Sequence, residues 1–518
     1  MRSVRYPASL IICGFMVFLF VVHGWAHDQR RAMETADGYL KRGMYLEAIG
    51  AYRNVADNAV DRDMKARAAL RIGDIYGYFL DNYDAALQFY FFVTKNYSSS
   101  SHAANAYFNA GMILYEKSRH SEALAQFREY LARFPDGSRR QTAEFMIQAC
   151  MKPPPPGEQK KEAAPAVGAD EMIRVLIMEG VKTVRIGGTA PCVIADRQTG
   201  AALGRLHTGQ PVSVSMYDRF LAVNAASLSR SFIVIRPESA GFVTVNEKPY
   251  RGTVTIKRNN NGIDVINRVR LEEYLYGVVP KEMSPTWPIE ALKAQAVAAR
   301  TFVLYHKEKN RDREYDVYAS TSSQVYGGVV AEDEKATAAV NETRSRILVH
   351  DGRLVLAYFH ANSGGVTENA ENVWTARVPY LKSVRDNFST GVPGTRWSLG
   401  VDFAGVARSL IGQGIKVGTI HEIKPAEVSP TGRVMKIAIN HSGGVTILRG
   451  NDFRIKYDPQ RIKSTLFHIQ NKGKGMTISG SGYGHGVGMS QWGAREMAAA
   501  GYGYGDILRF YYAGVEVK

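Results

Sequence analysis

The sequence is poor in cysteine and lacks the short motifs of common hydrolases and nucleotide-binding proteins. Its 518 residues include three cysteines, Cys13, Cys150 and Cys192, with no CxxC pair and no metal-site spacing. Whether Cys150 and Cys192 pair stays open, because a buried free thiol explains each equally well. No HExxH or GxSxG occurs, and the glycine-rich close of the chain fits neither GxGxxG nor a P-loop. Metalloprotease, serine-hydrolase and nucleotide-binding functions therefore lose support.

Acidic residues are also scarce relative to basic ones, which gives a net charge of +16. Such a charge favours an anionic partner or surrounding: membrane phospholipid, cell-wall polymer or nucleic acid. The basic residues are spread along the chain and no nucleic-acid-binding motif accompanies them, so we expect no nucleic-acid partner. The length predicts two or more domains, and the 45% of hydrophobic residues is typical of folded protein.

Residues 1–26 combine a basic flank with one long apolar run. Arg2 and Arg5 precede the run from Ala8 to Trp25, and the small residue Ala26 follows it. This pattern predicts an export signal cut after Ala26, and an uncleaved membrane anchor is the alternative. Both interpretations place the rest of the protein in the periplasm or cell envelope, the second with membrane association.

Residues 31–150 repeat a helical pattern. The segments Tyr45–Tyr52, Tyr83–Tyr90 and His120–Phe127 align, with alanines at 48, 86 and 123 that are 38 and 37 residues apart. This spacing resembles tetratricopeptide repeats, and an unrelated helical bundle with the same layers is the alternative. Repeat arrays usually present a groove to a protein or peptide, so we expect a protein partner that the sequence does not name.

A Pro-rich linker at 151–172 separates the helices from a strand-rich C-terminal domain at 173–518. Alternating apolar and polar residues between 173 and 265 predict a curled sheet or small barrel. Further on, helices alternate with short strands, and the region 403–464 reads as an inserted or peripheral unit. The predicted fold class is therefore α+β, with N-terminal helical repeats joined to a mixed, strand-rich domain.

The stretch Ile266–Tyr305 is the most informative part of the chain. It begins as a strand, and Pro285 and Pro288 predict a braced loop that carries Glu282. A long helix follows, with apolar residues at steps of three and four on one face. A carboxyl held between a strand and a packed helix is well placed for catalysis, although an ordinary surface glutamate is the simpler interpretation.

These residues resemble the signature of the SpoIID/LytB family. The run LEEYLYGVVPKEM at 271–283 is followed by WPIEALKAQAVAART at 287–301, and further similar stretches occur at 358–374, 379–384 and 482–494. The resemblance covers roughly the last two thirds of the chain. Some members of the family carry Cys and His zinc ligands after the helix, where this sequence has Ser320–Ser323, so we expect no metal and no other cofactor.

The resemblance also nominates site residues: Glu282 as the catalytic acid, and Arg300, Lys382, Ser363, His485 and Gln491 as substrate-binding residues. Arg300 and Lys382 have orientation of the Glu282 loop as an alternative role. For Ser363 a tight turn without ligand is an equal alternative, and for His485 a structural role is the default.

The family resemblance implies cleavage of peptidoglycan glycan strands by a lytic transglycosylase. One carboxyl group suffices for this reaction, because it protonates the leaving oxygen and the C6 hydroxyl of muramic acid attacks within the same molecule. The product is a 1,6-anhydromuramic end. Glu282 then needs a raised pKa, for which burial beside Trp287 or tyrosines is the expected cause. Cleavage confined to strands stripped of stem peptides is a further implication, and sporulation, division and wall remodelling all stay open as the process.

Two other functions stay open. One is a non-catalytic wall-binding protein that enhances an amidase. The other is an exported scaffold in which the helical repeats are primary and the C-terminal domain is degenerate.

Overall fold

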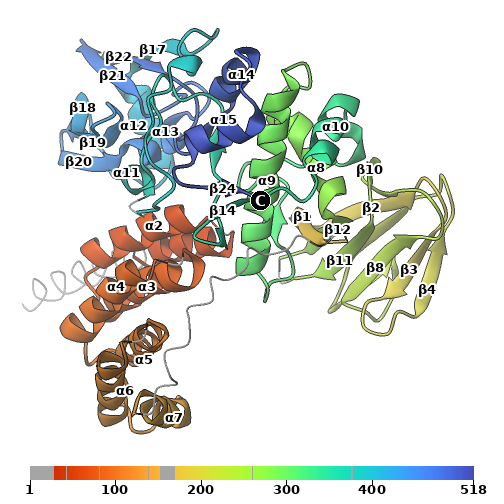
Figure 1. Cartoon of the computed structure of the whole chain (residues 1–518), viewed down its shortest axis with the longest axis horizontal. Helices are drawn as coiled ribbons and strands as arrows, with labels where there is room; N and C mark the ends of the chain where they lie inside the picture. The colour runs from red at the N-terminus through yellow and green to blue at the C-terminus, as the bar shows by residue number, and fades with distance from the viewer. Residues whose placement is uncertain are drawn as a thin grey trace, which may run out of the picture. The chain divides into compact units, whose positions relative to one another are not determined.

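The N-terminal part of the chain folds into a row of helices, each packed against the next (Figure 1). A helix over residues 29–41 comes first, and a π-helical turn, Ile75–Phe79, directly follows α3. The other helices are α2 (Tyr45–Asn58), α3 (Arg62–Asp74), α4 (Tyr83–Asn96), α5 (Ser101–Glu116), α6 (His120–Arg133) and α7 (Arg140–Met151). These ranges confirm that helices fill the predicted repeat region.

Small residues in this region make room for aromatic rings at a regular interval. A Cβ on Gly73 of α3 would lie 2.7 Å from the Tyr90 ring of α4, and one on Gly111 of α5 would lie 2.8 Å from the Phe127 ring of α6. The aligned alanines at 48, 86 and 123 are all fully buried. Membership of the tetratricopeptide class stays a prediction.

The computed structural model describes residues 29–151 apart from 43, 81, 118 and 138, and then 168 and 170–518 apart from 260, 375 and 376. The predicted export segment and most of the predicted linker lie outside these ranges. Within them, no helix has the length and apolar character needed to cross a membrane. Two units separate by their internal contacts: Met1–Gln159 with Trp374–Ala376, and Lys160–Val373 with Arg377–Lys518. Cys150 in α7 and Cys192 in β3 are both buried free thiols.

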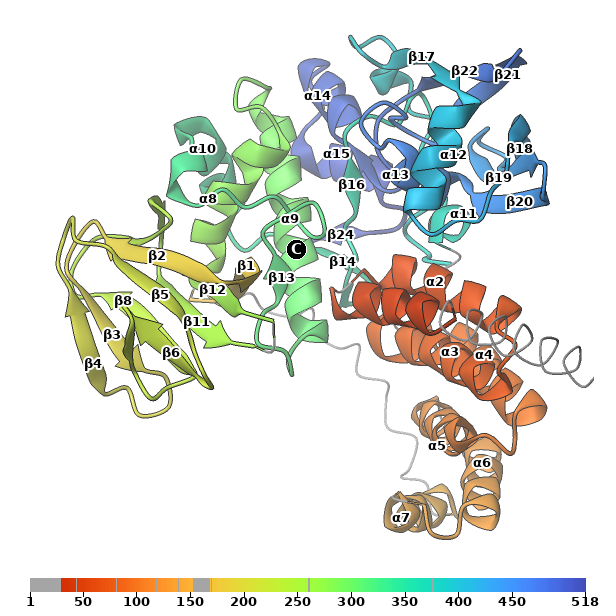
Figure 2. The ribbon, with the colours of Figure 1, turned by 180° about the vertical axis from the view of Figure 1, so that it is seen from behind.

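The second unit begins with two mainly antiparallel sheets (Figure 2). A strand-rich region was predicted here, but as one curled sheet or a small barrel. One has the strand order β13-β1-β12-β11-β8-β3-β4 and the other β10-β9-β2-β5-β6-β7. The strands between 202 and 227 were not anticipated. The bounds are β1 (Met172–Val181), β2 (Thr183–Gly188), β3 (Cys192–Asp196), β4 (Ala202–Leu206), β5 (Val212–Tyr217), β6 (Phe220–Val223), β7 (Ala226–Ser227), β8 (Phe232–Pro237), β9 (Val243–Val245), β10 (Lys248–Tyr250), β11 (Thr253–Arg258), β12 (Ile263–Arg270) and β13 (Val317–Tyr318).

Three helices follow β12 and form the centre of the unit: α8 (Leu271–Glu282), α9 (Ile289–Lys309) and α10 (Glu334–Glu342). The prediction of a long helix after Pro288 is confirmed, with Pro288 at the N-cap. Its burial differs from the prediction, because α9 is buried almost all round between Ala291 and His306 rather than on one face. A polar side chain in that span therefore needs a partner inside the protein.

The last third of the chain brings distant segments together. Short strands β14 (Leu348–His350), β15 (Arg353–Leu354) and β24 (Glu516–Val517) form one sheet, and β16 (Phe359–His360) pairs in parallel with β23 (Met489–Ser490). The helices here are α11 (Ala370–Trp374), α14 (Gln491–Ala499) and α15 (Tyr504–Tyr511).

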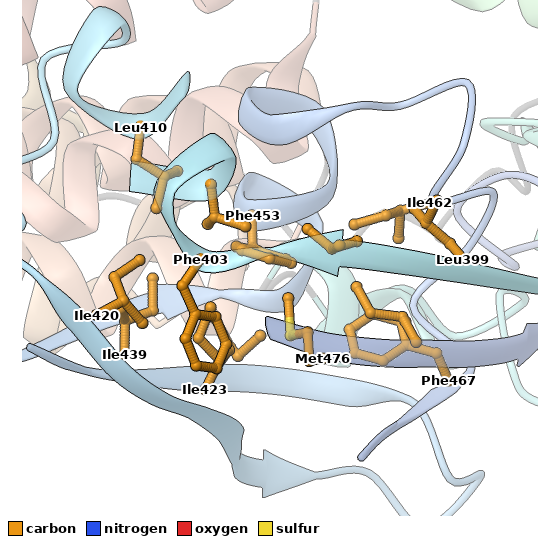
Figure 3. Close-up of a cluster of buried hydrophobic side chains, with 14 of the residues drawn as sticks. Leu399, Phe403, Leu410, Ile420, Ile423, Ile439, Phe453, Ile462, Phe467 and Met476 are labelled. Carbon is orange, nitrogen blue, oxygen red and sulfur yellow. The ribbon is translucent and has the colours of Figure 1, made fainter. Parts of the chain in front are cut away.

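The predicted peripheral unit has a core of its own (Figure 3). Phe403, Phe453 and Phe467 pack there with aliphatic side chains from the surrounding strands. The structure extends this unit beyond the predicted range of 403–464, because Leu399, Phe467 and Met476 belong to the same core. The elements are β17 (Arg396–Asp402), α12 (Phe403–Gly412), β18 (Ile420–Val428), β19 (Val434–His441), β20 (Gly444–Arg449), α13 (Gly450–Tyr457), β21 (Phe467–Lys472) and β22 (Gly475–Ser481).

Candidate functional site

Glu282 is the last residue of helix α8, and the prediction that it lies in a loop is wrong. The proline at 280 argued against a helix here, because a helix usually ends before a proline. Here Pro280 occupies the final turn, and the helix is closed by a hydrogen bond from the Met283 N–H to the Val279 carbonyl, 3.0 Å long. The helix therefore fixes the backbone from which the Glu282 side chain extends.

The Glu282 carboxyl accepts hydrogen bonds from two segments that lie far along the chain. The Val325 N–H donates to Oε1 at 2.9 Å, and the Gln491 side chain is a second partner. Burial raises the pKa of Glu282 above its ordinary value, and these two hydrogen bonds oppose the rise without cancelling it. Among the described residues no lysine or arginine forms an ion pair with this carboxyl. The expectation of a raised pKa caused by burial is thus confirmed in direction.

The loop that supplies the Val325 N–H is anchored on both sides. The Tyr274 hydroxyl of α8 donates to the Gln324 side chain at 3.0 Å, and the Tyr326 hydroxyl donates to Asn267 at 2.9 Å. Gly277 of α8 allows this close approach, since a Cβ there would lie 2.8 Å from the Tyr326 ring. The position of the donor is therefore set by packing rather than by a free loop.

Gln491 reaches Glu282 from the first turn of α14. Ser490 caps that helix through its side-chain oxygen, which accepts from the Gly493 N–H at 3.2 Å. The Gln491 side-chain amide also donates to Gln295 of α9 at 3.4 Å. The structure thus brings Glu282 and Gln491, two of the predicted site residues, into contact.

Gln295 was missed by the sequence reasoning. Its side chain is fully buried, and its Nε2 has no hydrogen-bond partner among the described residues. The available signal was a lone amide between alanines on a buried helix, which demands a polar partner.

Two tryptophans follow the two contacting residues in sequence. Trp287 lies just beyond Glu282 and Trp492 just beyond Gln491, and their ring centroids are 4.8 Å apart with planes inclined at 52°. Both residues are partly exposed, and the Arg495 guanidinium lies over the Trp492 ring at 5.2 Å. An aromatic surface is therefore available near the carboxyl.

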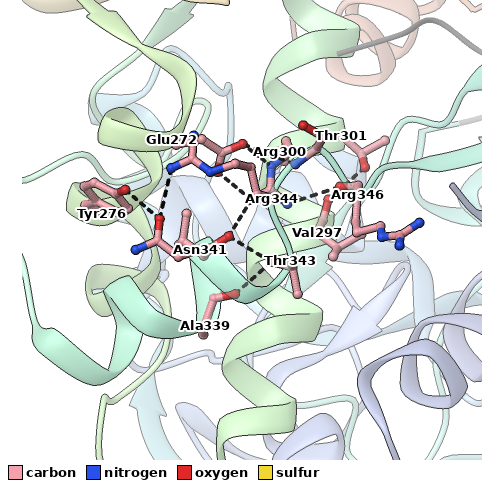
Figure 4. Close-up of polar contacts among 12 residues, drawn as sticks. Glu272, Tyr276, Val297, Arg300, Thr301, Ala339, Asn341, Thr343, Arg344 and Arg346 are labelled. Atoms are coloured by element: carbon pink, nitrogen blue, oxygen red, sulfur yellow. Dashed lines mark hydrogen bonds and ion pairs between the residues drawn. The ribbon is translucent and has the colours of Figure 1, made fainter. Parts of the chain in front are cut away.

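Arg300 lies buried beside Glu272, and the prediction that it binds substrate conflicts with this burial (Figure 4). Its side chain is 0% exposed and forms a two-pronged ion pair with Glu272 of α8, with N–O distances of 2.6 and 3.0 Å. Two further guanidinium N–H groups donate to the carbonyls of Val340 and Arg346. Arg300 joins α9 to α8 and to the end of α10, which agrees with the alternative of an orienting role.

Lys382 and Ser363 are likewise engaged within the protein. Lys382 pairs with Glu371 at 3.0 Å. Ser363 is fully buried, and its hydroxyl donates to Asp386 at 2.7 Å, so binding of sugar through this side chain conflicts with its burial. The tight-turn alternative fits Ser363 better.

His485 holds a glycine-rich loop against β16. Its Nδ1 accepts from the Val487 N–H, and its Nε2 donates to the Phe359 carbonyl, both at 3.1 Å. Burial, together with nearby arginines, lowers its pKa to about 3, so the imidazole is neutral. These contacts give His485 the structural role that was the default.

The glycines beside His485 approach protein groups. A Cβ on Gly488 would lie 2.0 Å from the Tyr358 carbonyl, and one on Gly486 would lie 2.4 Å from the guanidinium of buried Arg433. These glycines therefore allow the backbone to lie close to other groups of the same chain.

Comparison with known proteins agrees with this layout. A family model described as Stage II sporulation protein matches residues 259–350, which hold α8, α9 and the Val325 loop. A second model, described as a domain of unknown function, matches residues 396–488 and coincides with the peripheral unit.

Individual relatives are similar to this chain over a longer stretch than the 92 residues of the first model. The chain is 33% identical over 305 residues to stage II sporulation protein D of Bacillus subtilis, covering 56% of this chain and 85% of that protein. It is 36% identical over 298 residues to an uncharacterized protein of Brachyspira hyodysenteriae, covering 57% and 79%. It is 30% identical over 285 residues to an amidase enhancer of Bacillus subtilis, covering 46% of this chain and 39% of that protein. The coverage and identity of these matches establish that the chain belongs to the SpoIID family of stage II sporulation proteins.

Proposed function

We propose that this protein is an exported lytic transglycosylase that cleaves peptidoglycan glycan strands, with Glu282 as the single acid and base. The observation that carries the proposal is the Glu282 carboxyl: its pKa is raised by burial, and among the described residues no cation is paired with it. A carboxyl in this state stays protonated to higher pH than an exposed glutamate, which is what a general acid needs.

The proton movements follow from one carboxyl group. Protonated Glu282 donates to the glycosidic oxygen as the bond to C1 of muramic acid breaks and the ring becomes oxocarbenium-like. The resulting carboxylate then accepts the proton of the muramic acid C6 hydroxyl as that oxygen attacks C1. The bond formed gives the 1,6-anhydro ring, and Glu282 returns to its protonated form without a bound water.

The neighbours of Glu282 suit both stages. The Val325 N–H and the Gln491 amide favour the carboxylate that forms after the first step, while burial favours the acid that starts it. Neither partner carries a charge. They therefore favour the carboxylate over the protonated acid less strongly than an adjacent arginine would. The Trp287–Trp492 pair supplies aromatic faces against which sugar rings can stack.

The test uses purified protein, peptidoglycan with and without stem peptides, and mass spectrometry of the released fragments. Wild type should release anhydromuramic ends, and Glu282→Gln should lower the rate by at least about 100-fold, the lower end expected for a general acid. Glu290→Gln, a carboxyl of the neighbouring α9, is the matched control and should keep activity. Absence of anhydromuramic ends with wild type on both substrates would reject the proposal.

A non-catalytic role in enhancing an amidase is the second candidate, and the similarity to an amidase enhancer favours it. The two candidates differ in what Glu282 does. An enhancer binds wall material and stimulates an added amidase equally well with Glu282→Gln, whereas the enzyme loses product formation.

The helical repeats are tested separately by removing residues 27–171. The strand-rich unit contains its own buried core, so we expect the shortened chain to keep turnover on soluble glycan. Loss of the cellular phenotype with turnover intact would assign the repeats to an unknown protein partner. Loss of the phenotype when the full-length chain itself shows no turnover would instead favour the scaffold interpretation.

A further inference from the structure

The outer face of the seven-stranded sheet carries a row of polar side chains. Strand pairing places Arg174 of β1 opposite Arg268 of β12, and Arg268 opposite Thr253 of β11. In the neighbouring row Ile266 lies between Leu176 and Thr255. Successive residues point to opposite faces of a strand, so these side chains share one face, while Ile173, Val175 and Val254 fill the core on the other.

A cleft of about 550 Å³ lies on this outer face. Its floor combines the apolar side chains of Ile266, Val234 and Phe232 with the hydroxyls of Thr253 and Thr255. Its rim is cationic and includes residues from the last turn of α9 and the segment after it, which run beside the sheet in Figure 2. The cationic lining residues are Arg174, Arg197, Arg268, Lys307 and Arg311, against one acidic lining residue, Glu314.

Internal ion pairs neutralise only part of this charge. Arg174 pairs with Asp316 at 2.6 Å, Arg197 with Glu314 at 2.9 Å, and Lys307 with Glu171. Exposed Arg268 has no ion pair with any other described residue. The Arg311 side chain is 76% exposed, and its ion pair with Glu308 is long, with 3.9 Å between nitrogen and oxygen. Two guanidinium groups at the cleft are therefore available to a ligand.

We propose that this cleft binds the carboxylate of a peptidoglycan fragment, at a site separate from Glu282. The proposal rests on the proposed function for the identity of the polymer. Guanidinium groups bind carboxylates with directed, charge-assisted hydrogen bonds, while the threonine hydroxyls and the Phe232 ring suit the sugar or peptide that bears the carboxylate. The cleft volume lies in the range of small-molecule sites.

The two sites lie along the same helix. Gln295, which contacts the Glu282 partner Gln491, and Lys307 at the cleft rim are about 18 Å apart along the axis of α9. A carboxylate in the cleft is thus too far from Glu282 to take part in the reaction, and it holds substrate instead. Its source is either the lactyl group of peptide-free muramic acid or the C-terminus of a stem peptide.

The experiment measures binding by calorimetry with the full chain carrying Glu282→Gln, which prevents turnover. The probes are a peptide-free tetrasaccharide of N-acetylglucosamine and N-acetylmuramic acid, its methyl ester, and a free stem peptide. At least one free acid should bind. Arg268→Glu, and independently Arg311→Glu, should weaken that binding by about 10-fold or more, as expected for loss of a hydrogen bond to a charged group. Whichever free acid responds identifies the source of the carboxylate.

Arg219→Glu provides the matched control, because Arg219 is 79% exposed, lies outside the cleft lining and undergoes the same charge change. It should leave binding unchanged, and the methyl ester should bind about 10-fold more weakly than the acid if the tetrasaccharide is the ligand. Three results would overturn the proposal. The first is an equal effect of Arg219→Glu and Arg268→Glu, and the second is equal binding of acid and ester with no binding of the stem peptide. The third is no binding of either free acid. Failure of wild type to form anhydromuramic ends bears on Glu282 alone, since Arg268-dependent binding would still support the cleft.

Discussion

The side-chain amide of Gln491 donates to the side-chain oxygen of Gln295, 3.4 Å away, and so joins the start of α14 to the buried helix α9. Gln491 also contacts Glu282, so Gln295 fixes the orientation of a residue that adjusts the pKa of the candidate acid. Gln295 acts through Gln491 and is a positioning residue in the proposed reaction.

Replacing Gln491 by leucine should move the alkaline limb of the activity profile to higher pH. The reaction starts from protonated Glu282, so activity falls as pH rises through the pKa of Glu282. The Gln491 hydrogen bond lowers that pKa, so its loss lets burial raise the pKa of Glu282 further. Gln295→Leu should shift the limb in the same direction, because it leaves Gln491 unoriented. Rates measured from pH 4 to 9 test this, with Gln413→Leu at an exposed position as control. An unmoved limb in Gln491→Leu would contradict the prediction.

Gly277→Ala should lower activity although alanine favours a helix. Alanine is about 1 kcal/mol better than glycine inside a helix, so a loss must come from packing. The added Cβ meets the Tyr326 ring and displaces the loop that supplies the Val325 N–H. Turnover and urea unfolding measured together separate the two effects. Gly412→Ala at the end of α12 has open space around its Cβ and should leave both unchanged. Full activity in Gly277→Ala would show that the loop tolerates the shift.

Arg300→Met should destabilise the protein by about 3–5 kcal/mol, because it leaves Glu272 buried without its partner. Arg300→Met combined with Glu272→Met should recover much of that loss, since neither charge then remains unpaired. Urea unfolding of the two single variants and the double variant forms the cycle that measures the coupling. A stable Arg300→Met protein with a raised KM would restore the substrate-binding role that its burial argues against.

Glu282→Gln should stabilise the folded protein at neutral pH. The folded-state pKa of Glu282 is raised, so stability falls as pH rises from the unfolded value, about 4.3, through the folded one. A neutral glutamine avoids that loss, and the advantage should vanish below pH 4. Thermal unfolding at pH 3.5 and 7.5 provides the comparison.

Glu290→Gln should change the stability of the folded protein in the opposite direction in the same measurement. Burial opposes ionisation of Glu290, but Lys293 and the Tyr504 N–H lower its pKa overall, so its charged form adds stability above the unfolded pKa. Its replacement should therefore destabilise the protein at pH 7.5 and matter less at pH 3.5. If the two variants behaved alike, the burial argument for Glu282 would be wrong.

The sequence allowed β12 and α9 beside the site to be predicted, but neither the helix α8 between them nor the side chains that meet there. The strand before Arg270, the helix after Pro288 and the acid between them follow from periodicity and proline placement. The helical position of Glu282 does not, because a proline beyond the first turn disfavours a helix and the sequence does not show the packing that keeps Pro280 inside α8. The ion pair between Arg300 and Glu272 could not be predicted either, because a sequence motif does not show whether a residue is buried. Ser363 and His485 stand in stretches that resemble the family, and their contacts hold the chain together.

The contact between Gln295 and Gln491 also limits how early in synthesis the site can be complete. Gln295 and Gln491 are 196 residues apart in sequence, which corresponds to about 10–40 s of translation. Until β23 and α14 have been made, Glu282 has the Val325 N–H available but lacks Gln491. The protein therefore carries its candidate carboxyl through most of the second half of its synthesis without the complete site, and the last segment to be made completes it.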